Sequence, residues 1–118
     1  MKNISFLLPL ILCCCIEPTF FPLEIVSAEY FNDDTCKLGY RGGSNGGHYD
    51  FFKNLIASNS GKFNTYSCKD FKWIDRFTPS LTKTYYVLWR ANEKWDKGKT
   101  VEFMGLGSTD KIRFKVPN

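Results

Sequence analysis

The clearest helical pattern in the sequence lies near the middle of the chain. Its apolar positions share one helical face, namely Phe51, Phe52, Leu55 and Ile56. Asp50 would fall in the first turn, where a carboxylate interacts favourably with the helix dipole. Gly61 follows a Ser-Asn-Ser run and would stop the helix. The pattern predicts one helix over residues 47–58.

Beyond Gly61 the alternation of apolar and polar side chains has a period of two, which is typical of half-buried strands. Residues 82–91 are rich in aromatic and β-branched side chains and are predicted to form a central strand. A break is expected at residues 78–80 (TPS) and a turn at Asp96-Lys97-Gly98. The predicted strands are 62–68, 71–77, 82–91, 100–106 and 110–116.

The order of these elements predicts the fold class. Residues 29–47 are polar and glycine-rich, apart from the Tyr30-Phe31 pair, and are expected to form a flexible lead-in to the helix. Four or five antiparallel strands then follow the helix. The prediction is an α+β domain, a single helix packed on one face of a twisted antiparallel β-sheet. Aromatic residues make up 17% of the chain, which suits a small core built from large side chains.

The N-terminal segment resembles a secretory signal peptide. Lys2 supplies positive charge, and residues 6–16 (FLLPLILCCCI) form an apolar run that is too short to span a bilayer. Small or modest side chains at Val26-Ser27-Ala28 predict cleavage after Ala28, although the long segment before them leaves the cut site open. The predicted division is a signal peptide at 1–28 and one domain at 29–118. A retained membrane anchor is the less favoured alternative.

Removal of this peptide would leave two cysteines, Cys36 and Cys68. An even pair in a secreted protein predicts one disulfide. That crosslink would close a loop of about 30 residues and would stabilise the domain by roughly 3–4 kcal/mol. Two free thiols are the alternative if the protein ends in a reducing cytosol.

Residues 42–50 (GGSNGGHYD) hold four glycines and the chain's only histidine. They match neither a dinucleotide-binding nor a P-loop pattern, because no strand precedes them and no lysine follows. A loop that leads into a helix is therefore favoured over a phosphate site. His48 lacks companions for zinc and a second proton-transferring group nearby, so it is not favoured as a ligand or as a base. We expect no metal and no cofactor.

The formal charge of +4 favours solubility and weak attraction to polyanions. Aromatic and basic residues interleave in two segments, which in an RNA-binding protein would supply stacking rings and phosphate contacts. In the alternative interpretation the aromatic rings belong to the core, and the Lys and Arg side chains lie on the solvent-exposed face. The alternation favours this interpretation for about half of these residues. The two groups are Lys69, Phe71, Lys72, Trp73 and Arg76, then Tyr85, Tyr86, Trp89, Arg90 and Trp95.

The pattern resembles microbial ribonucleases of the T1/F1 type and, more closely, the ribonuclease-like effectors secreted by cereal powdery mildew fungi. The resemblance rests on the leader, on Glu29-Tyr30-Phe31, and on residues 83–116 (KTYYVLWRANEKWDKGKTVEFMGLGSTDKIRFKV). The chain departs from those effectors in its cysteines. They commonly have Tyr-x-Cys at the mature N-terminus and a second cysteine near the C-terminus, whereas residues 69–118 contain none here.

The resemblance also allows the family's catalytic positions to be compared with this sequence. The position that matches the family's catalytic Glu is Val87, and the last strand has no histidine. Glu102 and Arg90 are weak substitutes, so a pseudoenzyme is expected. The resemblance then implies a secreted effector that promotes virulence inside the plant host cell, acts as a monomer without membrane contact, and can be recognised by an intracellular leucine-rich-repeat (NLR) immune receptor.

Several alternatives stay open beside this expectation. They are an active guanyl-preferring ribonuclease, a non-catalytic host RNA-binding protein, and an apoplastic binding or inhibitor protein. The candidate receptor surface is the loop at residues 92–99 together with the exposed basic residues of the last strands. Candidates for RNA or receptor contact are Lys72, Arg76, Arg90, Trp95, Lys97, Lys99 and Arg113.

Overall fold

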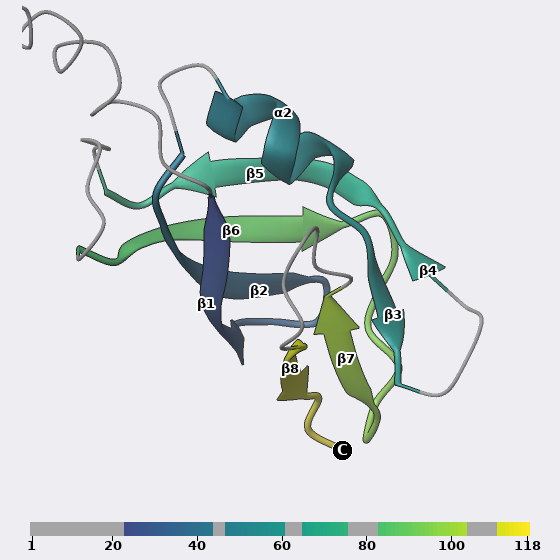
Figure 1. Cartoon of the computed structure of the whole chain (residues 1–118). Coiled ribbons are helices and arrows are strands. Elements are labelled where there is room, and N and C mark those ends of the chain that lie inside the picture. Colours follow the sequence, from purple (N-terminus) through teal and green to yellow (C-terminus); the bar gives the residue numbers. More distant parts are fainter. Residues whose placement is uncertain (1–22, 44–46, 61–64, 76–82, 104–110) are drawn as a thin grey trace, which may run out of the picture.

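The structure is a computed structural model that describes residues 23–43, 47–60, 65–75, 83–103 and 111–118. The described part of the chain contains one helix and eight strands (Figure 1). The strands form two antiparallel sheets of four strands each.

The first sheet has the order β1-β2-β6-β5. Its alternating burial follows the sequence, since every second side chain of β6 points into the core and is buried. The prediction of a central strand within residues 82–91 is confirmed for Tyr85–Ala91, because β6 pairs with both β2 and β5. The strands of this sheet are β1 (Glu24–Tyr30), β2 (Thr35–Arg41), β5 (Cys68–Trp73) and β6 (Tyr85–Ala91).

The second sheet has the order β4-β3-β7-β8 and its strands are shorter. Ser67 alone separates β4 from β5, so one segment passes from the second sheet into the first. At the other side, β1 lies against β8. The two sheets therefore enclose a shared core. The strands of this sheet are β3 (Ala57–Asn59), β4 (Thr65–Tyr66), β7 (Thr100–Phe103) and β8 (Ile112–Lys115).

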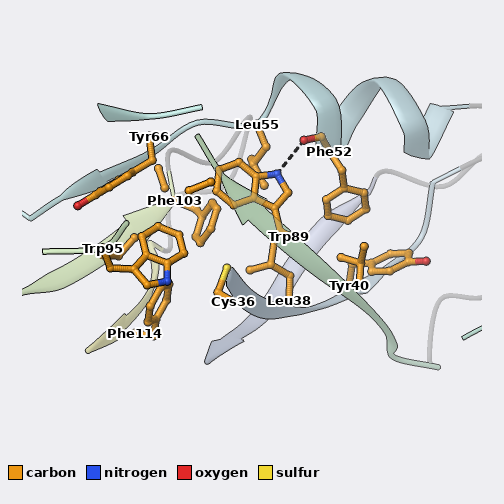
Figure 2. Close-up of a cluster of buried hydrophobic side chains, with 14 of the residues drawn as sticks. Cys36, Leu38, Tyr40, Phe52, Leu55, Tyr66, Trp89, Trp95, Phe103 and Phe114 are labelled. Atoms are coloured by element: carbon orange, nitrogen blue, oxygen red, sulfur yellow. Dashed lines mark hydrogen bonds between the residues drawn. The ribbon is translucent and has the colours of Figure 1, made fainter. Parts of the chain in front are cut away.

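Trp89 lies at the centre of that core. Its ring contacts Phe103 of β7 at 5.2 Å between centroids and stacks on Trp95 at 6.5 Å. Its indole N–H donates to the carbonyl of Phe52, at 2.8 Å, and this bond ties the helix α2 (Gly47–Asn54) to the first sheet (Figure 2). A buried indole needs such an acceptor. Trp89 thus joins the helix to both sheets.

The predicted fold class is wrong. A single helix is present in the described residues, as predicted, and Asp50 is in its first turn. However, the domain is mostly β, with two sheets instead of one sheet covered by a helix, and it is not a ribonuclease T1/F1 fold. The prediction missed β1 and β2, which it placed in the leader and in a glycine-rich lead-in. Residues 35–41 (TCKLGYR) carry the period-two signal, since Cys36, Leu38 and Tyr40 are all buried.

Helix α2 is also shorter than the predicted 47–58, because it ends at Asn54. Residues 57–59 pair with β7 as strand β3, and Ser58 and Asn59 are buried there. Tertiary pairing therefore overrides the helical pattern at its C-terminal end. Leu55 is buried as predicted, whereas Ile56 is 40% exposed.

The expected disulfide is not formed, and Cys36 and Cys68 are both free thiols. Cys36 of β2 lies opposite Trp89, and Cys68 of β5 lies opposite Ala91, so β6 runs between the two cysteines. Two strand spacings amount to about 9.5 Å. Bridged cysteines keep their Cα atoms within about 7 Å. The order of strands in the sheet therefore excludes the crosslink in this fold.

Candidate functional site

A hollow of about 180 Å³ lies between helix α2 and strand β5. The helix contributes one aromatic and one basic side chain, and β5 contributes the remainder. The hollow is lined by Tyr49, Lys53, Cys68, Lys69, Asp70, Phe71 and Trp73. We call it the α2–β5 hollow. A second hollow is described below, and the α2–β5 hollow contains more of the aromatic and basic residues that the sequence singled out.

Three rings form a continuous row in the α2–β5 hollow. Phe71 lies 5.3 Å from Tyr49 and 5.2 Å from Trp73, measured between ring centroids. Phe71 and Trp73 point to the same face of β5 because they are two residues apart. Phe52 supports both rings from the core side, at 6.0 and 5.7 Å. Tyr49 is 55% exposed and Trp73 41% exposed, so the row offers ring surface to a ligand.

The charges around the hollow leave it basic. Lys53 lies above the ring of Tyr49, with its Nζ 5.9 Å from the ring centroid, and Lys69 is exposed on β5. Asp70 is held by two hydrogen bonds from the guanidinium of Arg90. That hydrogen bonding lowers the pKa of the Asp70 carboxyl, which is already charged at neutral pH. Its negative charge is therefore directed at Arg90, while the two lysines face the hollow.

The thiol in the hollow is not an activated nucleophile. Burial, together with a smaller effect of the nearby Asp70 carboxylate, raises the pKa of Cys68 to about 11, against a still smaller lowering by Lys53. A reactive cysteine needs a lowered pKa, because the thiolate is the nucleophile. The α2–β5 hollow is therefore suited to binding through rings and ammonium groups, and less to covalent chemistry.

His48 has a structural position. It is 5% exposed, and its Nε2 lies 2.9 Å from the carbonyl oxygen of Gly42. Its ring packs on Tyr40 and Trp73, at 5.5 and 6.3 Å between centroids. Gly42 and Gly43 have φ angles of 76° and 85° there, which favour glycine. The interpretation of these glycines as a lead-in to the helix fits this geometry, while residues 44–46 lie outside the described part.

The other candidate contact residues are dispersed. Trp95 is 4% exposed and its indole N–H donates to the carbonyl of Thr35, so its ring belongs to the core. Arg90 is engaged by Asp70, and Arg113 forms an ion pair with Glu102 at 3.3 Å. Arg76 lies outside the described residues. Lys72, Lys97 and Lys99 are exposed, and Arg113 is exposed too although it is paired with Glu102.

A second hollow, of about 320 Å³, lies beside the predicted receptor loop. Two contacts hold the loop against the β1–β2 turn. The main-chain N–H of Trp95 donates to the carbonyl of Asp33 at 2.8 Å, and the Lys94 ammonium pairs with the Asp33 carboxylate at 3.5 Å. Gly98, in the predicted turn, has a φ of 77°. The second hollow is lined by Tyr30, Asp33, Lys94, Trp95, Lys97, Val116, Pro117 and Asn118.

Sequence reasoning missed Tyr49 and Lys53, which complete the α2–β5 hollow. It assigned the helix by its buried stripe, whereas these two residues lie four apart on the more exposed side. An aromatic residue followed by a lysine at this spacing was the available signal, since such side chains meet on a helix surface. What no local pattern gives is the position of that helical face next to β5.

Within the described ranges the structure shows neither a metal-binding cluster nor a membrane-spanning helix. No group of three His, Cys, Asp or Glu side chains within them could hold a metal ion. None of the helical residues placed by the structure forms a segment long and apolar enough to cross a membrane.

Comparison with known proteins gives a likeness of fold to one solved structure and no match in sequence. No protein-family model and no curated protein matches the sequence. The chain is similar in structure to the N-terminal part of the bacterial S-layer protein SbsC, with a TM-score of 0.60 and 11% identity. The match covers 82% of this chain and 24% of that chain. At this identity the likeness is one of fold alone, and the similar structure is part of an S-layer protein and not the expected ribonuclease.

Proposed function

We propose that this chain is a secreted, non-catalytic effector-type protein that acts by binding a macromolecule of a plant host. The observation that carries the proposal is the α2–β5 hollow, where exposed rings lie beside Lys53 and Lys69. Aromatic side chains are enriched at binding surfaces, and the lysines beside them attract anionic partners. The leader-like N-terminus supports secretion, and the sequence resemblance to mildew effectors supports the host. A ribonuclease scaffold is not part of this proposal.

The placement of the titratable groups also favours binding over catalysis. His48 is buried against Gly42, and Arg90 is held by Asp70. Glu102 lies between Lys111 and Arg113, at 3.6 and 3.3 Å, on the sheet that does not contain Arg90. Cleavage of RNA by attack of the 2′-hydroxyl needs a base and an acid on either side of one phosphate. The side chains that sequence analysis considered for these roles are engaged in separate structural contacts.

The first experiment tests the non-catalytic part of the proposal. The purified secreted protein is incubated with total RNA beside a His48→Ala variant and a ribonuclease control. We expect both proteins to leave the RNA intact. Degradation by the wild-type protein that is lost in His48→Ala would instead establish the active ribonuclease.

The second experiment tests action in the host. The tagged protein is expressed in leaf tissue, alone and together with candidate intracellular leucine-rich-repeat receptors. We expect protein inside host cells and cell death that depends on one receptor. Retention outside the cells with no receptor response would favour an apoplastic binding protein and would contradict intracellular action. A charge reversal at Lys97, in the exposed loop beside the second hollow, tests whether that loop contributes to the response.

A further inference from the structure

Among the residues that the structure describes, no strand pairs with the outer edge of β5. It is the last strand of the first sheet, and β6 is its sheet neighbour. Trp73 lies opposite Val87, and the next residue, Ile74, donates its N–H to the carbonyl of Tyr86 at 3.1 Å. Directly opposed residues in an antiparallel pair alternate between bonded and non-bonded pairs. The main-chain groups of Phe71 and Trp73 therefore point away from β6, toward the open edge.

The α2–β5 hollow runs along this edge. Its lining includes the consecutive residues Asp70 and Phe71, whose side chains lie on opposite faces of the strand. A hollow above one face would contact alternate residues, whereas a hollow at the edge contacts both. An extended chain placed there would meet the free amides of β5 and the row of rings formed by Tyr49, Phe71 and Trp73.

Charge determines what kind of chain fits. Lys53 and Lys69 line the hollow, and Lys72 is exposed on the same strand. The carboxylate of Asp70 is directed at Arg90. An incoming strand with carboxylates would meet the ammonium groups of the lysines that line the hollow beside the rings, and electrostatic complementarity of this kind selects partners.

The same lysines disfavour a second copy of this chain. Two β5 strands that paired antiparallel with Phe71 opposite Trp73 would place Lys72 of one copy directly opposite Lys72 of the other, and like charges on paired strands are destabilising. Lysine on an edge strand is a common means of preventing such self-association. The edge is therefore blocked to itself and open to an acidic partner.

We propose that an extended acidic segment of a partner protein adds to β5 as a further strand. Its main chain pairs with Phe71 and Trp73, an apolar side chain enters the ring row, and its carboxylates contact Lys53 and Lys69. Peptide recognition by strand addition takes affinity from main-chain bonds and specificity from such side-chain sites. This inference rests on the proposed binding function and names the class of partner.

The test uses the full secreted protein and a short peptide of alternating glutamate and valine. Binding is followed by tryptophan fluorescence, to which the exposed Trp73 contributes, and by NMR shifts of the Phe71 and Trp73 amides. We expect saturable binding that moves those amides. The same peptide N-methylated at alternate residues cannot donate main-chain bonds from one edge, and it should bind at least about tenfold more weakly. A lysine–valine peptide should show no binding.

Protein variants locate the charges. Lys53→Glu combined with Lys69→Glu should weaken the acidic peptide about tenfold or more. Lys115→Glu is the matched control, because Lys115 is an exposed lysine on β8, the edge strand of the other sheet. The peptide modification keeps the test decisive even if a charge variant folds poorly.

Four outcomes would overturn the inference. They are equal binding of the N-methylated peptide, no binding of the acidic peptide, sedimentation of the protein as a dimer joined through β5, and binding of oligouridine at these amides in place of peptide. None of them makes the protein a ribonuclease. The two proposals therefore fail separately, since RNA degradation would overturn the proposed function whatever the peptide result.

Discussion

At the scale of single residues, Gly43 and His48 depend on each other. Gly43 has a φ of 85°, and a Cβ added to it would lie 2.6 Å from Nε2 of His48. His48 cannot easily retreat, because it is buried and bonded to the Gly42 carbonyl. We expect Gly43→Ala to lower the free energy of unfolding by about 1–3 kcal/mol, measured by chemical denaturation.

Gly98→Ala is the matched control for that change. Gly98 has a similar φ of 77°, but the nearest atom to an added Cβ belongs to the side chain of Asn118, which is exposed. The control therefore carries the backbone strain without the fixed obstacle. We expect Gly43→Ala to cost more than Gly98→Ala, and equal losses would show that His48 does not constrain the loop.

The two thiols are expected to react with iodoacetamide in a fixed order. Burial raises the pKa of both, to about 11 for Cys68 and further for Cys36. Because the folded pKa of Cys68 lies above its unfolded value of 9.0, the thiol stays protonated near pH 8. The folded state loses stability relative to the unfolded state only as the pH rises above 9 toward 11, where the unfolded thiol ionises first. Labelling of Cys68 should accelerate between pH 8 and 11, with Cys36 labelled only after unfolding.

Mass spectrometry at several pH values checks this order. Rapid labelling of Cys68 near pH 7 would contradict the raised pKa. A non-reducing digest that contained a Cys36–Cys68 crosslink would contradict the free thiols and the sheet order that separates them.

At the scale of elements, β1 bears on where the domain begins. The predicted cleavage after Ala28 falls inside β1, which pairs with β2 from Glu24 to Tyr30. Leu23, Ile25 and Ala28 pack against the core. Loss of this apolar contact and of the ladder bonds should lower the stability of a 29–118 chain by at least about 2 kcal/mol relative to a 23–118 chain.

Thermal melting of the two chains gives that comparison, and N-terminal sequencing of the secreted protein gives the natural start. We expect the secreted protein to begin at or before Leu23. A start at Glu29 together with equal melting temperatures would show that β1 is dispensable.

The elements also show how far local patterns reach. The helix start, the central strand β6 and the Gly98 turn follow from residues close in sequence, and the sequence predicted them. Strand β3 was missed because its first two residues, Ala57 and Ser58, fell within the predicted helix and become a strand by pairing with β7. The disulfide failed for a similar reason, since the separation of Cys36 from Cys68 depends on β6 lying between their strands.

For the candidate site the same limit applies at the scale of the whole molecule. The sequence singled out Lys69, Phe71 and Trp73 by their alternation, and these residues line the α2–β5 hollow. It also offered Trp95, which the packing of two sheets buries. Which rings face solvent is decided by how the second sheet covers the first, and no local window contains that information.

That shared core predicts cooperative unfolding of the whole domain. Trp89 of the first sheet contacts Phe103 of the second, and the segment through Ser67 belongs to both sheets. Neither sheet can keep its apolar face buried without the other, so we expect one transition with coincident tryptophan fluorescence and far-ultraviolet circular dichroism. Trp89→Phe, which leaves the Phe52 carbonyl without its buried donor, should shift both probes equally and cost about 1–3 kcal/mol. If the variant separated the two curves, the sheets would be independent folding units, and the edge of β5 would belong to a sheet that opens without unfolding the rest.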